Sequence, residues 1–376
     1  MNYLIFADEK WDSPPIGYTR KRLITAFSKQ CGGIVFCVDR PSTIIDGLAS
    51  VIKWMLAKKA VKLSDSLYLL SVFMPFHEKI SSKYKLASRL NNYFLDKQIS
   101  RIIKNISNAN DVHAVWLFHP YQIGIYDLYK KARKIYECYD NYSSAYNLKE
   151  NERRRLADYD KLLSKEADAI LVTAKALLNK KLIYKDKTHY NPNGVDYDYY
   201  EKSPKDILSI KRPIAGYIGG IDERIDMKLL EYAAKKDENI NYLFIGPIKK
   251  GIKLYKGRNM VYLGPKAPSQ IPGYLKCCDL GIIPYAKYDY LKSVYPTKAN
   301  EYLACGLPVV ATCFSDLSEF NDLVYVANGA DDYCTKIKLA INESNNEDKI
   351  KERKEMAKKN SWDNRAKYIL EILKDK

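Results

Sequence analysis

Short apolar runs alternate with polar turns and amphipathic segments along the first half of the chain. The runs lie at residues 3–7, 34–38, 66–73, 113–118, 134–140, 168–174 and 187–195. Compact apolar runs of this length, separated by segments with helical spacing, are typical of buried strands in a parallel sheet. The pattern predicts a doubly wound α/β domain in this half.

A polar, proline-containing stretch at residues 197–212 interrupts the alternation, and a second series then begins. Its apolar runs lie at residues 214–220, 241–247, 259–265, 279–285 and 307–311. We therefore predict two Rossmann-like doubly wound parallel-sheet domains, 1–200 and 205–358, facing across a cleft. Residues 361–376 form an amphipathic helix with Ser361 as its N-cap, and the first domain is one candidate surface for it.

The segment 293–312, SVYPTKANEYLACGLPVVAT, carries the strongest local signal. Pro296 suits a first helical position, and Gly306 is a natural end of the helix. Lys298 and Glu301 share one helix face. Ala299, Tyr302 and Leu303 form the opposite, apolar stripe. A cation one turn before a carboxylate, at a helix N-terminus near strand ends, suits a phosphate beside a hydroxylated sugar.

A second candidate lies after the first strand of the second series. Gly219 and Gly220 allow a tight turn and a close backbone approach, and Arg224 follows in the same turn. Arg224 could hold a diphosphate together with Lys298. The alternative is that the glycines only form a turn and that Arg224 pairs with Asp222 or Asp226. His119, which precedes a proline, is open to a similar alternative as a loop histidine with satisfied partners.

Composition narrows the function classes. The 376 residues are 47% hydrophobic, which excludes a disordered chain, and the net charge is +17. Between residues 53 and 104, eleven basic residues face three acidic ones, an excess of eight. This excess suits a nucleic acid, an anionic membrane surface or an anionic substrate. A helix over 51–62 would place Lys59 and Lys62 among apolar residues, which favours a solvated helix over an interfacial one.

Cysteine use and hydropathy bear on the compartment. The eight cysteines include no CxxC pair and suit buried thiols in a reducing cytoplasm. No uncharged apolar run reaches 18 residues, so we expect a cytoplasmic chain, at most peripheral on the inner face of the cell membrane. No nucleic-acid module is recognisable, and no nucleic-acid partner is expected. The D-x-D at 196–198 lies in a turn, and no metal cofactor is expected.

Segments 217–234, 242–247, 260–265, 274–285 and 295–312 occur in an order that resembles the second domain of group 1 (family-4-like) glycosyltransferases of the GT-B fold. Enzymes of teichuronic-acid-type surface-polysaccharide synthesis are the most similar subgroup. The resemblance covers residues 212–326, extends to 191–196 and is thin before residue 134. It departs from the family at Ser293, where a first glutamate is common.

The resemblance implies a role for each matching position. Arg224 and Lys298 would hold the diphosphate, and Glu301 would accept hydrogen bonds from the ribose. The backbone from Val294 through Tyr295, Pro296 and Thr297 would contact phosphate or sugar, and Gly264 would border the base. In the first domain, Gly17 would face the diphosphate, His119 the donor sugar and Asp140 the acceptor.

The implied activity is transfer of a sugar from a nucleotide diphosphate donor to a hydroxyl of a polysaccharide or lipid-linked acceptor. We expect a retaining, metal-independent reaction. An inverting one would need a base, for which Asp8, Asp12 and Asp140 are candidates. Two alternatives stay open: a nucleotide-sugar 2-epimerase of the same fold, and a basic non-catalytic protein that binds nucleic acid or another polyanion.

Overall fold

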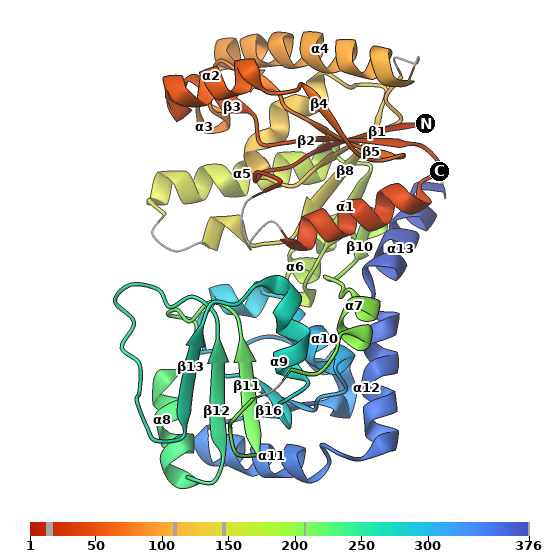
Figure 1. Cartoon of the computed structure of the whole chain (residues 1–376). Helices are drawn as coiled ribbons and strands as arrows, with labels where there is room; N and C mark the ends of the chain where they lie inside the picture. The colour runs from red at the N-terminus through yellow and green to blue at the C-terminus, as the bar shows by residue number, and fades with distance from the viewer. Residues whose placement is uncertain (13–17, 108–110, 145–147, 207, 375–376) are drawn as a thin grey trace. The chain divides into compact units, whose positions relative to one another are not determined.

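The chain forms two compact α/β units in a computed structural model that describes residues 1–12, 18–107, 111–144, 148–206 and 208–374. The first unit comprises Met1–Pro192 with Arg365–Lys376, and the second comprises Asn193–Asn364 (Figure 1). The expected domain boundary lay between residues 200 and 205. The units divide eight residues before position 200.

The first unit is built on an eight-stranded sheet in the order β10-β9-β8-β7-β1-β2-β5-β4. The strands are β1 (Asn2–Phe6), β2 (Ile34–Val38), β4 (Ala60–Ser64), β5 (Leu67–Leu70), β7 (Ala114–Leu117), β8 (Arg133–Cys138), β9 (Ala169–Val172) and β10 (Thr188–Tyr190). Adjacent strands run parallel, except that β4 pairs antiparallel with β5. The expected run at 187–195 is thus a strand only at its start.

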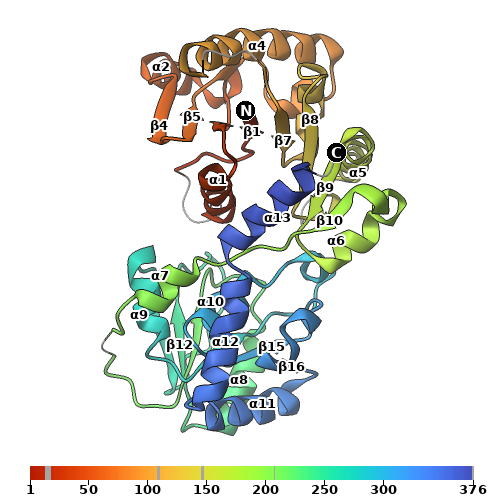
Figure 2. The same cartoon turned by 90° about the vertical axis from the view of Figure 1, so that its right-hand side faces the viewer.

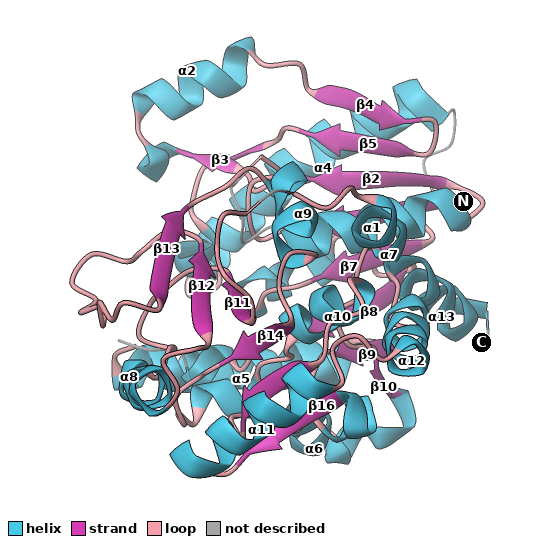
Figure 3. Ribbon diagram, turned by 60° about the horizontal axis from the view of Figure 1, so that its bottom comes forward, coloured by secondary structure: helices cyan, strands magenta, loops and turns pink. Residues whose placement is uncertain are grey.

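Helices cover both faces of this sheet (Figure 3). They are α1 (Tyr18–Gln30), α2 (Leu48–Leu56), α3 (Glu78–Ser81), α4 (Lys85–Ser107), α5 (Glu150–Glu166), α6 (Lys175–Lys180) and α13 (Trp362–Lys374). A small ladder, β3 (Ser42–Thr43) with β6 (Phe73–Met74), lies beside them. The central strands β1, β2 and β7 are buried along their whole length, apart from the first residue of β2. This burial explains their unbroken apolar sequence.

The second unit is built on a six-stranded parallel sheet in the order β13-β12-β11-β14-β15-β16. Its strands are β11 (Ile214–Ile218), β12 (Asn241–Ile245), β13 (Met260–Gly264), β14 (Leu280–Ile283), β15 (Val309–Thr312) and β16 (Val324–Ala327). Its helices are α7 (Tyr197–Lys202), α8 (Met227–Lys236), α9 (Ile271–Leu275), α10 (Thr297–Ala304), α11 (Ala330–Asn342) and α12 (Glu347–Lys359). The doubly wound α/β class is confirmed in each unit.

The strand order reverses once in each sheet. In the first unit, β2 and β7 lie on opposite sides of β1, and in the second unit β12 and β14 lie on opposite sides of β11. At such a switch point the two loops that leave the carboxyl ends of the strands diverge to opposite faces. The crevice between them is where open α/β sheets bind ligands.

Of three expectations for helix α10 and its ends, one is wrong and two are confirmed. Pro296 is the N-cap of α10 (φ −81°, ψ 69°) and not its first helical residue, because Thr297 begins the helix. Gly306, with φ at 79°, follows the end of that helix as expected. The stripe of Ala299, Tyr302 and Leu303 is fully buried, which confirms the core face.

The C-terminal helix α13 packs within the first unit from Arg365 onward (Figure 2). The Arg133 guanidinium of β8 donates to the carbonyl oxygens of Ile372 and Leu373 at 2.7 and 2.5 Å. A cation on the last carbonyls of a helix offsets their partial negative charge. At the other end, the Ser361 hydroxyl accepts from the Asn364 N–H at 3.4 Å, as expected of an N-cap.

The helix expected over residues 51–62 is wrong in its extent. Helix α2 ends at Leu56, and Lys62 lies on strand β4. Lys59 folds back over the helix end. Its ammonium lies 3.7 Å from the Trp54 ring centroid and donates to the Trp54 carbonyl. Neither lysine therefore belongs to the helix, so neither interrupts its apolar face.

Candidate functional site

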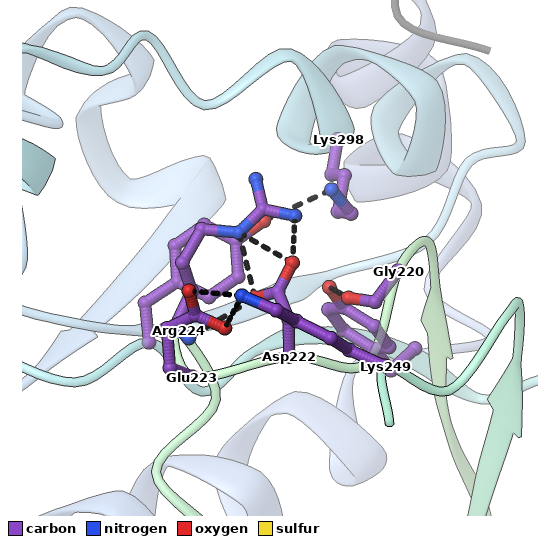
Figure 4. A network of polar contacts seen from close by, with 8 residues as sticks. Gly220, Asp222, Glu223, Arg224, Lys249 and Lys298 are labelled. Carbon is purple, nitrogen blue, oxygen red and sulfur yellow. Dashed lines mark hydrogen bonds and ion pairs between the residues drawn. The ribbon is translucent and has the colours of Figure 1, made fainter. Parts of the chain in front are cut away.

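The switch point of the second unit lies between β11 and β14, and two sequence-predicted segments meet there. The turn of residues 219–226 leaves the carboxyl end of β11, and α10 follows the loop that leaves β14. The turn is joined to that loop through the backbone, since Asp226 N–H donates to Pro284 O and Ala286 N–H donates to Arg224 O. The structure thus brings Gly219 against Lys298 and Gly220 beside Arg224, and Figure 4 shows Gly220, Arg224 and Lys298 around this turn.

Glycines keep the backbone of this turn open. Gly219 has φ at 136°, and a Cβ there would lie 2.6 Å from Cε of Lys298. Gly246, just after β12, has φ at 151°, and a Cβ there would lie 2.0 Å from the Gly219 carbonyl oxygen. The adjacent turns after β11 and β12 therefore pack backbone to backbone, which only glycine allows at these angles. The absence of a Cβ at Gly219 lets the Lys298 side chain lie directly against the backbone of the turn.

Lys298 is held over two tyrosine rings. Its ammonium donates to the Tyr285 hydroxyl at 2.9 Å and lies 5.5 Å from the Tyr217 ring centroid. Burial acts to raise the pKa of Tyr285, but the charges of Lys298 and Arg224 outweigh burial, so this pKa lies below its ordinary value. The tyrosines, which the sequence reasoning missed, fix the position of the lysine.

Arg224 forms an ion pair with Asp222, one of the two pairings that the sequence allowed as an alternative to ligand binding. Its Nε and Nη2 donate to the two carboxylate oxygens at 2.8 and 2.6 Å. The pair takes one edge of the guanidinium, and Nη1 is directed away from the carboxylate (Figure 4). A Cβ on Gly220 would lie 3.7 Å from Nη2, so the arginine stands beside the open backbone. Pairing therefore orients Arg224 within the crevice and does not remove it.

Glu301 lies one turn after Lys298 on α10. Burial raises the pKa of its carboxyl, which the Lys298 charge and an interaction with Tyr200 oppose. The side chain is still partly exposed. A half-buried carboxylate can accept hydrogen bonds from hydroxyl groups.

The start of α10 is anchored by amides that sequence reasoning missed. The Asn300 side chain is fully buried, donates to the Tyr295 hydroxyl at 2.9 Å and accepts from the Asn360 amide at 2.9 Å. Asn193 donates to Thr297 Oγ1 at 3.3 Å. These hydrogen bonds connect the start of α10 to segments that are distant in the sequence. The resemblance at residues 191–196 was the only sequence feature that pointed to such a contact.

The remaining predicted donor positions are placed as follows. Tyr295 is buried and donates to Glu319 Oε1 at 2.8 Å, so only its backbone is available to a ligand. Pro296 and Ser293 are buried too. Gly264 ends β13 at φ 68°, two strands from β11, and accepts from the Gly246 N–H. Gly17 lies outside the described residues.

The switch point of the first unit lies between β1 and β7. The Gln122 side chain spans it, because Nε2 donates to Phe6 O at 3.2 Å and Oε1 accepts from the N–H groups of Phe118 and His119 at 3.0 Å. Sequence reasoning had no signal for this glutamine, whose contacts are set by the fold.

His119 caps the 3₁₀ helix Pro120–Asp127 that follows β7. Its Nδ1 accepts from the Tyr121 N–H at 3.1 Å, and its ring lies 4.4 Å from the Tyr142 ring. Burial lowers the pKa of His119 to about 4, so the ring is neutral at pH 7 with its proton on Nε2. This ring can donate to a hydroxyl but offers no lone pair on Nε2. The contacts match the loop-histidine alternative.

Carboxylates gather beside His119. Asp8 pairs with Arg20 Nη1 at 2.8 Å and accepts from the Tyr139 hydroxyl at 2.7 Å, and Glu9 lies 3.1 Å from the same arginine nitrogen. The Arg20 guanidinium stacks 3.8 Å from the Tyr139 ring centroid. Burial, followed by the charge of Asp8, raises the pKa of Glu78 to about 7.

Asp140 and Asp12 are the other first-unit candidates. Asp140 follows β8 in a small hollow that Asp160 and Lys181 also line. The ammonium of Lys181 pairs with the Asp160 carboxylate at 2.5 Å. Asp12 is exposed. Of the three carboxylates named as bases, Asp8 alone lies beside the first unit's switch point.

Comparisons with known proteins address the class of protein. The chain shares the fold of a sucrose-phosphate synthase from Thermosynechococcus elongatus, with a TM-score of 0.70 at 12% identity over 100% of this chain and 98% of the other. The Anabaena protein Alr3699/HepE, solved in complex with UDP and glucose, matches with a TM-score of 0.66 at 13% identity over 99% of both chains. The fold is therefore GT-B, two Rossmann-like domains in one chain.

Residues 212–343 match the family model of the group 1 glycosyl transferases. The expectation drawn from residues 212–326 is confirmed. The chain is also 28% identical over 246 residues to TuaH of Bacillus subtilis (strain 168), a glycosyltransferase provisionally assigned to teichuronic acid biosynthesis. That alignment covers 60% of this chain and 62% of TuaH, less than two thirds of the relative's length.

Proposed function

We propose that the protein is a glycosyltransferase that moves a sugar from a nucleoside diphosphate donor to an acceptor hydroxyl. The observation that carries the proposal is the pair of cations, Arg224 and Lys298, at the switch point of a domain that matches the group 1 glycosyl transferases. Two cations beside open glycine backbone suit an anion with several oxygens.

The donor's diphosphate would lie between Arg224 Nη1 and the Lys298 ammonium, over the Gly219–Gly220 backbone. Glu301, one turn along α10, would accept hydrogen bonds from the ribose hydroxyls. Gly264, two strands away, would border the base. The backbone at 294–297 would complete the contact with phosphate or sugar. This arrangement follows the strand order of the sheet, in which β13 and β14 lie on opposite sides of β11.

The reaction breaks the bond between the sugar's anomeric carbon and the diphosphate oxygen, and forms a bond from that carbon to the acceptor oxygen. Negative charge develops on the leaving diphosphate, where Arg224 and Lys298 would stabilise it. We propose retention of configuration, in which a phosphate oxygen takes the acceptor's proton. The two cations would supply the positive charge, so no metal cofactor is part of the proposal.

The first unit would bind the acceptor and face the donor sugar. His119 would donate from Nε2 to a sugar hydroxyl, and Asp140 would line the acceptor side. If transfer inverts configuration, Asp8 is the carboxylate whose position at the switch point suits a base. The assignment of TuaH to teichuronic acid biosynthesis supports a surface-polysaccharide or lipid-linked acceptor. A membrane-associated acceptor would place the protein on the inner face of the cell membrane.

The test is a transfer assay with a panel of nucleotide sugars and total lipid or polysaccharide extract as acceptor. Products are identified by mass spectrometry. We expect one donor to raise the unfolding temperature, because binding to the folded state stabilises it. We also expect an acceptor-dependent glycosylated product from that donor. An epimerised donor formed without acceptor, or no donor that binds, would contradict the proposal.

A further inference from the structure

An apolar surface on the first unit lacks a covering element in the described part of the chain. It is made by α2, the turn before it and the first half of α4, and we name it the α2–α4 surface. Its apolar members are all exposed: Ile44, Ile45, Leu48, Ile52, Met55, Leu56, Leu86, Leu90, Tyr93 and Phe94. Leu48 and Leu56 are 75% and 83% exposed. Contiguous exposed apolar side chains on a folded domain mark a contact surface.

Helix α2 has no buried residue, although it is nine residues long and mostly apolar. Val51 and Trp54 are only partly exposed and face the protein, where Trp54 Nε1 donates to Ser71 O at 3.2 Å. Leu48, Ile52, Met55 and Leu56 follow the spacing i, i+4, i+7, i+8 and form the outward face. The helix is thus apolar on the side that no described element covers.

Helix α4 presents a similar outward stripe. Its buried face consists of Ala87, Asn91, Leu95, Ile99 and Ile103. The opposite face carries Leu86, Leu90 and Tyr93, and continues with Lys97, Arg101 and Lys104, all exposed. At 100° per residue these six positions lie within one narrow sector, directed away from the sheet. The stripe is therefore apolar in the first half and basic in the second.

Aromatic contacts join the two helices into one surface. The Trp54 ring of α2 lies 5.1 Å from the Phe73 ring, and Phe73 lies 6.3 Å from the Phe94 ring of α4. The edge strand β4 continues the sheet on the α2 side (Figure 3), and its Val61 and Leu63 are exposed on one strand face. Helix α2 lies beside the first half of α4, where the apolar members are (Figures 1 and 2).

Positive charge surrounds these apolar residues. Lys53 lies on α2, Lys58 follows its end, Lys83 precedes α4, and Lys85 and Arg89 lie at the start of α4, all exposed. Helix α2 carries no acidic residue. The side chain of Asp46, before α2, accepts from the Thr43 backbone and hydroxyl at 2.8 Å. Apolar side chains with a basic rim match the interface of a bilayer that contains anionic lipids.

We propose that the α2–α4 surface docks on the headgroup region of an anionic lipid bilayer, with α2 lying in the interface. A second copy of the chain is a poorer occupant, because it would bring like charges together across the contact. The inference is independent of the transfer reaction, since it rests on the surface and not on the donor site. It would hold this unit at the membrane, where a lipid-linked acceptor is presented.

The test is co-sedimentation of the full chain with phosphatidylglycerol vesicles and with phosphatidylcholine vesicles. We expect binding to the anionic vesicles, and a large loss of binding when salt rises from about 0.1 M to about 1 M. The variant Ile52→Ser/Met55→Ser/Leu56→Ser should lower the partition coefficient at least about tenfold. All three side chains are exposed, so the variant keeps the fold, which circular dichroism checks.

The matched control is Leu182→Ser/Ile183→Ser, which removes two exposed apolar side chains of the same unit near β10, at the opposite edge of the sheet. It should bind vesicles like the unchanged protein. Equal loss in both variants, absence of vesicle binding, or self-association that the α2 variant abolishes would each overturn the inference. Donor-induced thermal shift of the same samples separates these outcomes from failure of the proposed activity.

Discussion

At the switch point of the second unit, the side chains beside the open backbone are the cations Arg224 and Lys298. At the switch point of the first unit, they are the carboxylates Asp8 and Glu9, locked onto Arg20. The same topology thus carries opposite arrangements of charge. In the second unit an arginine is one-third exposed and oriented by one acid, while in the first an arginine is 10% exposed and neutralised by two.

The difference separates a cation available to a ligand from a cation used for structure. Arg20 stacks on Tyr139 and pairs with two carboxylates, so it has little capacity left for a bound anion. Arg224 stands beside Gly220, where a Cβ would meet only ordinary contacts at 3.6 and 3.7 Å, and Lys298 lies directly against the Gly219 backbone. These contacts support the proposal that the second unit holds the diphosphate of the donor. In the first unit, hydroxyl, imidazole and carboxylate groups lie at the corresponding place, which supports the proposal that it contacts sugar hydroxyls.

The comparison predicts the largest effect for Arg20→Met. Removing the arginine leaves two carboxylates, one of them almost fully buried, without their partner, which costs about 3–5 kcal/mol of the free energy of unfolding. Arg224→Met is the matched control and should cost less than about 1 kcal/mol, because its ion pair is partly exposed. Urea denaturation measures both. Equal costs would show that the two arginines have the same role.

Gly246→Ala should have the next largest effect. Its Cβ would lie 2.0 Å from the Gly219 carbonyl oxygen, at a positive φ, so the two turns must move apart. We expect a loss of about 3 kcal/mol in unfolding free energy. Gly251→Ala is the control, since its φ is 91° and nothing lies within 4 Å. It should lose only about 1 kcal/mol. A tolerated Gly246→Ala would mean that the turns do not need this close contact.

The buried carboxyl group of Glu137, beside Arg20 in the first unit, should make the free energy of unfolding depend on pH. Burial raises the pKa of its carboxyl to about 8, from 4.5. The folded protein then keeps a proton that the unfolded chain releases, so unfolding free energy falls as pH rises between these values. His119, with its pKa lowered to about 4 from 6.5, acts in the opposite direction between those two values. Above pH 6.5 the Glu137 effect is unopposed by His119.

We therefore expect the unfolding free energy to fall between pH 6.5 and 8, by at most about 1.4 kcal/mol per pH unit for this carboxyl. Glu78, whose pKa is raised to about 7, adds to the fall in the lower part of the window. Glu137→Gln should flatten the profile, whereas exposed Glu238→Gln should leave it unchanged. Denaturation across this range is the measurement. A profile that rises with pH would contradict the assignment.

Strand positions and the α10 unit were predictable because each depends on a local pattern. Buried strands need apolar runs, and α10 combines a turn, an apolar stripe and a terminal glycine in one segment. The end of α2 was not predictable, since it depends on Lys59 folding back over the helix and on β4 pairing with β5. That error hid the apolar face of α2.

The candidate site was predictable in its residue types but not in its contacts. Arg224 and Lys298 could be named from their turn and helix. Tyr285, which accepts a hydrogen bond from Lys298, follows a strand that is distant in the sequence from Gly219 and Arg224. Asp222, which pairs with Arg224, could not be distinguished from Asp226 by sequence alone. Asn300 lies on the helix face that sequence patterning assigns to neither the core nor the ligand, yet it is fully buried. Gln122 and Glu137 likewise gain their roles from neighbours far along the chain.

The central claim is that Lys298 holds the phosphates of the donor. The most direct test is isothermal titration of UDP, and in parallel GDP, into Lys298→Met and into Lys292→Met. Lys292 is an exposed lysine five residues before the start of α10, paired with Asp289 at 2.7 Å. The nucleotide that binds the unchanged protein should bind Lys298→Met at least about 30-fold more weakly, corresponding to ~2 kcal/mol, with Lys292→Met unaffected. Equal affinity of both variants for that nucleotide would contradict the account.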